Sequence, residues 1–182
     1  FALALFSGVA VKQAVAISLK PASVITDTTI KLGDVFDGLE HKSERVLGPA
    51  PRPGQTMTLN ARTLLRIAVA LDLNWRPASS ADTIVLTRAA TVIDRDTIED
   101  VLTQSLEAEG VNGRYNLVIP NDMAEMVLPH GTAKTVEVSS INFYPDTQRF
   151  DAILAGPNTD NPVRQLRVTG TLERLIEVPV LR

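Results

Sequence analysis

The sequence predicts an α+β protein of two small β-rich modules, each with one principal helix, the second carrying an antiparallel meander. Three observations predict this class. Apolar residues recur at helical spacing over residues 61–71 and 98–106. Elsewhere, short apolar stretches alternate with Gly, Pro, Asn and Asp, as is typical of strands joined by turns. From residue 135 onward the pattern is that of strands alone, and the two helical segments lie on opposite sides of a junction near residues 90–95.

The composition bounds the possible functions. The chain has 182 residues, 45% of them hydrophobic but only 4% aromatic, so its core must be mainly aliphatic. A net charge of −3, from 18 basic and 21 acidic residues in mixed order, argues against a nucleic-acid partner and a polybasic membrane segment. The absence of cysteine excludes disulfides, thiol chemistry and cysteine-ligated metal.

The first sixteen residues are predicted to be a secretory signal peptide. Phe1–Val11 is uncharged and largely apolar, and Ala14-Val15-Ala16 has the small-x-small pattern of a cleavage site. The apolar run is about half the roughly 20 residues that a membrane-spanning helix needs. We expect the chain to begin inside its signal, to be cleaved after Ala16 and to have no stable membrane insertion afterwards. The alternative is a buried N-terminal helix or strand, and Lys12 favours it.

The first module is predicted to span residues 17–92 and to consist of short strands around one helix. The segment Gly48–Gly54 contains three prolines, which lack backbone donors, and is expected to be an extended surface turn. Gly33-Asp34 interrupts the early strands, and Ser79–Asp82 reads as a turn. The expected strands are Ile17–Leu19, Val24–Ile25, Ile30–Leu32, Val35–Phe36, Thr56–Leu59 and Thr83–Arg88.

The helix of the first module is predicted to begin after Asn60, a residue type that favours the N-cap. Asn74 is expected to end it in the left-handed conformation. Trp75, the only tryptophan, is expected to pack back over the helix. The apolar residues at helical spacing are Ala61, Leu64, Leu65, Ala68 and Leu71, and the polar face carries Arg62, Arg66 and Asp72.

The second module, residues 93–182, is predicted to open with a helix that ends at Gly110. Asp94 and Asp96 compete for its N-cap: Asp94 would create a hydrophobic staple, and Asp96 would place Glu99 at the capping-box position. The expected buried stripe is Ile98, Val101, Leu102 and Leu106. A strand over Tyr115–Ile119 follows, with Pro120-Asn121-Asp122 as its exit.

The rest of the module is predicted to be a three-stranded antiparallel meander. Its first strand, Thr135–Tyr144, loses its alternation near Ser139-Ser140, which indicates a β-bulge. Turns are expected at Pro145–Gln148 and Gly156–Pro162. Inward-facing residues are expected to be Phe150, Ala152 and Leu154 on the second strand and Leu166, Val168, Gly170 and Leu172 on the third. Ile176–Leu181 is predicted to be a further apolar strand.

A search for catalytic or metal-binding patterns yields no assignment. The sequence contains no nucleophile elbow, phosphate loop or dinucleotide fingerprint. Each single residue has a simpler interpretation: solvated surface or turn histidines, capping aspartates, a chance Ser/Lys spacing, core methionines and a solvated arginine face. We therefore predict no enzyme activity, cofactor or metal, and leave the partner-binding residues unassigned. The residues considered are His41, His130, Asp94, Asp96, Ser18, Lys20, Met123, Glu125, Met126, Arg62 and Arg66.

Two ordered sets of motifs resemble a known family, the flagellar basal-body P-ring formation chaperones. The first set resembles the amino-terminal part of the longer form of this family, and the second resembles the domain before its SAF (β-clip) domain. The match covers most of residues 24–181. The motifs are Ile30–Phe36, Ala50–Gln55, Leu64–Trp75 and Thr87-Arg88-Ala89, then Tyr115-Asn116-Leu117, Asn142-Phe143-Tyr144, Arg149–Ala152, Val168-Thr169-Gly170 and Val178–Leu181.

The resemblance implies a non-enzymatic periplasmic chaperone that binds P-ring subunits and promotes their assembly around the flagellar rod. It also implies a SAF domain after Leu181, which this chain does not contain. Two alternatives remain: a SAF-type pilus-assembly or envelope-polysaccharide-binding module, and an enzyme whose catalytic domain lies beyond Arg182. Binding is expected to use exposed β edges and the proline-rich turn, because an unpaired edge is a template for a partner strand. The sequence does not show which edge is open.

Overall fold

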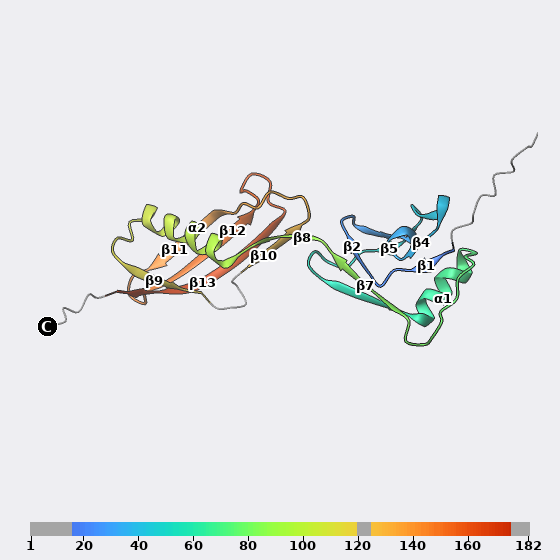
Figure 1. Cartoon of the computed structure of the whole chain (residues 1–182). Helices are drawn as coiled ribbons and strands as arrows, with labels where there is room; N and C mark the ends of the chain where they lie inside the picture. The colour runs from blue at the N-terminus through green and yellow to red at the C-terminus, as the bar shows by residue number, and fades with distance from the viewer. Residues whose placement is uncertain (1–15, 120–124, 176–182) are drawn as a thin grey trace, which may run out of the picture. The chain divides into compact units, whose positions relative to one another are not determined.

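The computed structural model describes residues 16–119 and 125–175, which form two compact units (Figure 1). The first contains the described residues up to Pro51 together with Thr56–Thr87, and the second contains Arg52–Gln55 and the residues from Arg88 onward. The protein is α+β and rich in short strands, as predicted. Three predictions fall outside the described residues: the signal peptide except Ala16, the exit turn 120–122 and the strand 176–181.

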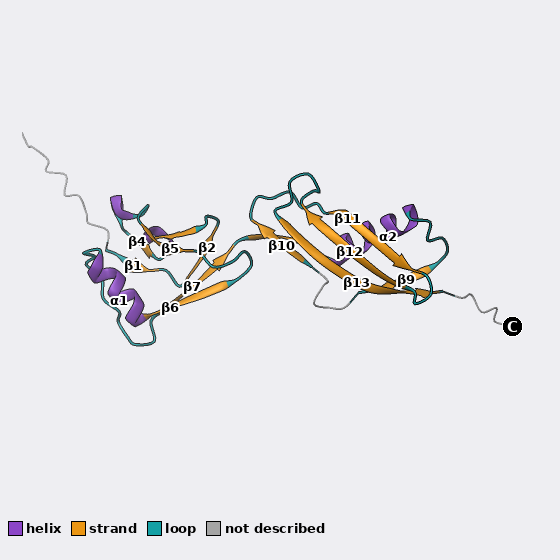
Figure 2. Cartoon of the chain, turned by 180° about the vertical axis from the view of Figure 1, so that it is seen from behind, coloured by secondary structure: helices purple, strands orange, loops and turns teal. Residues whose placement is uncertain are grey.

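The first unit contains three small sheets (Figure 2). Gly33-Asp34 interrupts the strands as predicted and lies in a short 3-10 helix, Leu32–Asp34; another spans Glu40–Lys42. The predicted strands are present, but β5 was missed in the proline-rich segment. Pro49 is tolerated there because β5 has a single hydrogen-bonded partner strand. The sheets are β1 (Ser18–Leu19) with β4 (Phe36–Asp37), β3 (Thr29–Lys31) with β5 (Val46–Pro49), and β2 (Ala22–Ile25), β7 (Thr83–Arg88) and β6 (Thr56–Asn60) in that order.

Helix α1 (Ala61–Ala70) begins as predicted and ends earlier than predicted. The Thr63 backbone N–H donates to Asn60 Oδ1 over 3.0 Å, which confirms the N-cap. At the other end, Asp72 rather than Asn74 has a positive φ, 49°. The Leu73 N–H then donates to the Ala68 carbonyl over 2.9 Å, the 6→1 bond of a Schellman motif. The prediction for Asn74 was wrong because the helix ends before it.

The core of the first unit is aliphatic apart from Phe36, which is 1% exposed. The ring of Trp75 lies 4.9 Å from that of Phe36 in an edge-to-face arrangement. Trp75 was expected to pack over the helix; it packs against a core cluster that includes Leu64 of α1, and its ring contacts Phe36 of β4. Leu65, grouped with the apolar helix positions, is 37% exposed, whereas Leu64 is fully buried. The apolar stripe of α1 is therefore narrower than the sequence pattern indicates.

Helix α2 (Arg95–Ala108) packs against the core of the second unit. The Thr97 N–H donates to Asp94 Oδ1 over 3.1 Å, so Asp94 rather than Asp96 is the N-cap. Gly110 ends the helix as predicted, with a φ of 91°, and the Val111 N–H donates to the Leu106 carbonyl. The predicted stripe is confirmed, with Val101 at its half-buried margin. Its fully buried members are Ile98, Leu102 and Leu106.

The meander forms with the predicted turns and the predicted bulge, which lies between Val138 and Ser140. Strand β9, from the segment before it, pairs antiparallel with its third strand. The result is a four-stranded sheet in the order β11, β12, β13, β9, with one face toward α2. Its strands are β11 (Glu137–Tyr144), β12 (Arg149–Gly156), β13 (Arg164–Arg174) and β9 (Tyr115–Val118).

Two further strands of the second unit were not predicted. β8 (Ala90–Ile93) and β10 (Met126–Pro129) pair antiparallel, with Met126 opposite Ile93. Because β8 belongs to this pair, the units divide between Thr87 and Arg88, earlier than the predicted junction after residue 92. Met126 is fully buried, in agreement with the interpretation as core; Met123 lies outside the described residues.

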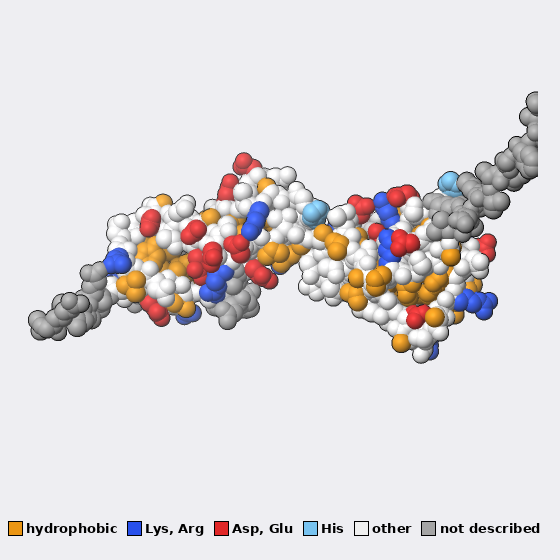
Figure 3. Space-filling view, viewed as in Figure 1, with side chains coloured by type: hydrophobic (Ala, Val, Ile, Leu, Met, Phe, Trp, Pro, Cys, Tyr) orange, Lys and Arg blue, Asp and Glu red, His pale blue; other side chains and the backbone are white. Residues whose placement is uncertain are grey.

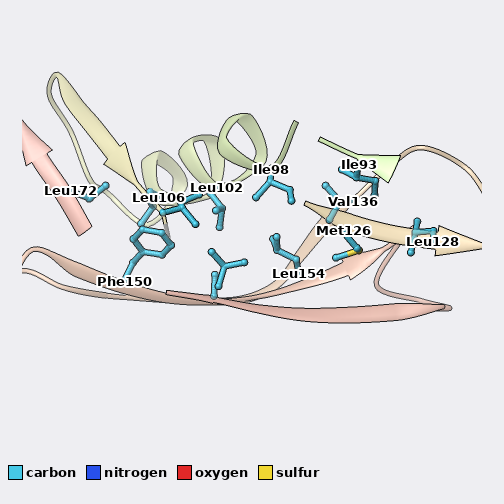
Figure 4. Close-up of a cluster of buried hydrophobic side chains, with 13 residues drawn as sticks. Ile93, Ile98, Leu102, Leu106, Met126, Leu128, Val136, Phe150, Leu154 and Leu172 are labelled. Carbon is cyan, nitrogen blue, oxygen red and sulfur yellow. The ribbon is translucent and has the colours of Figure 1, made fainter. Parts of the chain in front are cut away.

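The core of the second unit lies on one face of the four-stranded sheet (Figure 4). The side chains of the β8–β10 pair cover one end of that face. Those of α2 cover its middle, and Phe150 and Leu172 lie toward the other end. The β8–β10 pair and α2 thus cover one end and the middle of the helix-facing surface, and the exposed Tyr144 and Ile153 lie on the opposite face.

Candidate partner-binding site

The residues considered for chemistry do not converge on one site. His41 is exposed in the second short 3-10 helix, and His130 is exposed in a turn. The Lys20 ammonium donates to the Gly33 carbonyl over 2.7 Å and lies 3.3 Å from Asp37, so its contacts are not with Ser18. Within residues 16–119 and 125–175, no three His, Asp or Glu side chains are placed to hold a metal ion.

Arg62 and Arg66 are exposed on α1, as predicted. Leu65 and Val69, spaced between and beyond them at helical intervals, are 37% and 73% exposed. This face of α1 is therefore mixed, with two cations and two apolar side chains. The apolar component was not anticipated, because Leu65 was grouped with the buried positions.

Asp94 has a structural role that combines the cap with an ion pair. Its Oδ2 accepts a hydrogen bond from the Lys134 ammonium over 2.7 Å, and its Oδ1 accepts from both the N–H and the hydroxyl of Thr97. The Lys134 bond is the main cause that holds the pKa of Asp94 well below its ordinary 3.8, and the Thr97 bonds add to it. The carboxylate thus joins the start of α2 to the segment before β11.

Two other carboxylates of the second unit also have lowered pKa values. Glu137 accepts from the backbone N–H and hydroxyl of Thr159, and both bonds lower its pKa from 4.5. Asp151 has its pKa lowered by a two-pronged hydrogen bond from Arg167, in which Nε donates to Oδ1 over 2.9 Å and Nη2 to Oδ2. All three carboxylates therefore favour the folded state when ionised.

Acid is accordingly expected to destabilise the second unit. A folded-state pKa below the ordinary value contributes stability that is complete above the unfolded pKa and is lost as the pH falls through the folded pKa. We expect the melting temperature to fall more steeply below about pH 4 in the wild type than in Asp94→Asn, because asparagine keeps the cap but not the charge. Melting curves between pH 7 and 2 would test this, and parallel pH profiles for the two proteins would contradict it.

β11 is the longest edge strand among the described residues. It has eight residues, whereas the other edge strands of the three- and four-stranded sheets have four or five. Natural edges are usually protected by lysine, proline or a bulge. β11 has the bulge at Val138/Ser140, but Ser140–Tyr144 carries no charge or proline. This part of the strand is the candidate site, which we call the β11 edge.

The open face of the sheet borders the β11 edge. Ser140 lies opposite Ile153, which lies opposite Arg167, and Tyr144 lies opposite Arg149. Tyr144 is 52% exposed and Ile153 36%. The face combines an aromatic ring, an aliphatic side chain and the Arg167–Asp151 pair, so a strand added at β11 would meet both apolar and polar neighbours.

The proline-rich segment is less available than predicted. Gly48 and Pro49 are part of β5, and Arg52–Gln55 is grouped with the second unit. The Gly54 N–H donates to the Arg88 carbonyl, and the Arg88 N–H donates to the Gln55 carbonyl. The backbone of this turn is therefore largely engaged within the fold.

Arg88 is a feature that the sequence analysis missed as an individual residue. It is the buried charged side chain of the described residues, at 6% exposure, and its Nε and Nη1 have no hydrogen-bond partner there. A buried guanidinium with unused donors is costly. The alternation of β7, in which Ile84, Leu86 and Arg88 share the inward face, is the pattern that could have identified it.

Comparison of the chain with protein-family models, curated proteins and solved structures found no match. No helix in the described part of the chain is long and apolar enough to cross a membrane.

Proposed function

We propose that the chain is a periplasmic assembly factor for the flagellar P-ring that binds ring subunits and promotes their assembly around the rod. The single observation that carries the binding role is the β11 edge, an edge segment without charge or proline beside an open sheet face. The choice of the P-ring subunit as partner rests on the order of the sequence motifs.

The motifs themselves occupy core and turn positions. Ile30–Phe36 contributes four buried side chains, and Asn142–Tyr144 and Arg149–Ala152 flank the hairpin turn. Most of these residues specify the fold, whereas Asn142–Tyr144 also forms part of the β11 edge. The meander has two outer strands, but β9 pairs with β13, so β11 is the one left at the edge of the sheet.

Binding would proceed by strand addition. An extended segment of the subunit would hydrogen-bond to the free backbone groups of Ser140–Tyr144. Its alternate side chains would lie beside Val138, Ile141 and Phe143 on the helix side, which are half-buried against the core. The contact would satisfy backbone groups and cover apolar surface of an unassembled subunit, which is what an assembly chaperone must do.

The experiment is co-purification of the P-ring subunit with edge variants of the chain. Ser140→Lys and Asn142→Lys place the side chain used by natural proteins to block edges on exposed positions of β11. Together they are expected to reduce subunit capture by about tenfold or more, equivalent to roughly 1.4 kcal/mol of binding free energy.

The matched control is Ile153→Lys, which adds the same charge to the neighbouring strand β12 at a position that is 36% exposed. It is expected to retain most of the subunit capture. Equal loss in the control would assign binding to the sheet face, and full capture by the double edge variant would exclude strand addition. Capture of a pilus secretin or of envelope polysaccharide in place of the ring subunit would favour the alternative module.

A further inference from the structure

The second unit contains a pocket of about 620 Å³ at the carboxyl end of α2. It lies where three connections meet: the loop from α2 to β9, the hairpin between β11 and β12, and the end of β13. Its volume falls within the roughly 300–1,000 Å³ typical of ligand sites. It involves none of the residues used to test the proposed function.

The pocket arises because the helix is shorter than the sheet it covers. α2 has 14 residues, which extend about 21 Å, whereas β13 has 11 residues, which extend about 37 Å. The β8–β10 pair covers one end of the sheet (Figure 4). At the opposite end, the loop after Gly110, the β11–β12 hairpin and the end of β13 surround the pocket, whose floor is the helix-facing side of the sheet.

The floor of the pocket is apolar and its rim is cationic. Phe143, Leu172 and Tyr115 project from three strands onto the helix-facing side and are half-buried or buried. Arg174 continues the inward-facing series of β13 beyond Leu172 and lies directly opposite Tyr115 in the register with β9. Arg114 also lines the pocket, so its two guanidinium groups outnumber the one carboxylate, Glu109.

The polar groups of the pocket favour an anion over a cation. Several of its acceptors are already bonded: the Gly110 carbonyl accepts from Asn112, the Arg114 carbonyl from Leu175 and the Pro145 carbonyl from Gln148. The end of α2 is also capped, since Val111 bonds to the Leu106 carbonyl. Among the described residues, the exposed guanidinium of Arg174 has no partner. It is therefore available to a ligand acceptor.

We propose that this pocket binds an apolar group that carries one carboxylate, with the apolar part on Phe143, Leu172 and Tyr115 and the carboxylate on Arg174. Such a group can be a free medium-chain carboxylic acid or the carboxyl terminus of a polypeptide. The pocket shares Phe143 with the β11 edge, but Arg174, Leu172 and Tyr115 lie outside that edge. The proposal does not depend on the P-ring assignment.

The test is titration of the ¹⁵N-labelled full chain, followed by amide chemical shifts. The probes are octanoate and acetyl-Ala-Ala-Leu with a free carboxylate, each compared with its neutral amide. At least one acid is expected to saturate near or below about 1 mM, with shifts at 110–115 and 172–175, and its amide to bind about tenfold more weakly. The acid that binds more tightly identifies the source of the ligand.

Arg174→Gln is expected to weaken binding of the acid about tenfold and Arg174→Lys to restore part of it, because lysine keeps the charge but not the planar fork. The matched control is Arg149→Gln, an exposed arginine of β12 that does not line this pocket, which should bind as the wild type does. The proposal is overturned if neither acid saturates below about 10 mM, if the amides bind equally well, or if the shifts lie outside the pocket.

Discussion

Gly170→Ala is expected to destabilise the second unit by about 3 kcal/mol, because there is no room for a methyl group at this position. A Cβ there would lie 2.5 Å from both Phe150 Cε1 and the Val118 carbonyl oxygen. The oxygen belongs to the backbone of β9, which pairs with β13, so it cannot move without breaking the ladder. The ring of Phe150 lies over the glycine from the neighbouring strand.

Urea unfolding followed by circular dichroism would measure the loss, and hydrogen exchange over residues 149–174 would assign it to the sheet. Gly48→Ala is the control, since a Cβ at that strand position meets nothing within 4 Å. Adding Phe150→Leu to Gly170→Ala should cost less than the sum of the two single changes, because the smaller side chain relieves part of the clash. Strict additivity, or a stable Gly170→Ala protein, would contradict this packing.

Phe36→Ala is expected to destabilise the first unit by about 4 kcal/mol. Removing a fully buried phenylalanine typically costs about 3–5 kcal/mol, and the edge-to-face pair with Trp75 adds about 0.5–1.5 kcal/mol to its burial. The side chain is 1% exposed and lies 4.9 Å, centroid to centroid, from the tryptophan ring. Phe36→Leu should show a smaller loss, because it keeps most of the volume and removes only the aromatic contact.

Trp75 provides the measurement, because it is the single tryptophan of the chain. Its fluorescence should shift to longer wavelength in Phe36→Ala under native conditions, and the urea midpoint followed by this signal should fall. Val69→Ala on α1, at a position that is 73% exposed, is the matched control and should change neither quantity appreciably. A Phe36→Ala protein with wild-type emission and midpoint would show that the two rings do not support each other.

The sequence pattern was sufficient to predict the features that depend on residues close together in the chain. The caps at Asn60 and Asp94, the end of α2 at Gly110 and the bulge near Ser139 all depend on residues within one or two turns of each other. The side chains of Asn60 and Asp94 accept from backbone groups three residues further on, and Gly110 supplies a positive φ, so each signal lies in the local sequence. The sequence did not decide whether Asp94 or Asp96 is the N-cap of α2, because both carboxylates can accept a hydrogen bond from a backbone N–H.

Strand pairing was not predictable in the same way. β8 and β10 are short, four residues each, and are stable only because they pair with each other across a separation in sequence. Pro49 in β5 contradicts local strand propensity, and its pairing with β3 overrides it. The left-handed residue after α1 is Asp72 rather than Asn74, because the packing of Leu73 and Trp75 against the core decides where the chain must turn.

The sequence by itself determined the α+β class, the two helices with the N-cap of α1 and the end of α2, and the meander with its turns and bulge, because these follow from contacts between residues near each other in the chain. Only the tertiary structure decided that β9 closes one side of the meander and leaves β11 open. It also decided that α2 stops short of the sheet to leave a pocket between Arg174 and Phe143. Both features depend on which distant segments pack together and on the relative lengths of the helix and the strands. The local periodicity of apolar residues does not specify this packing.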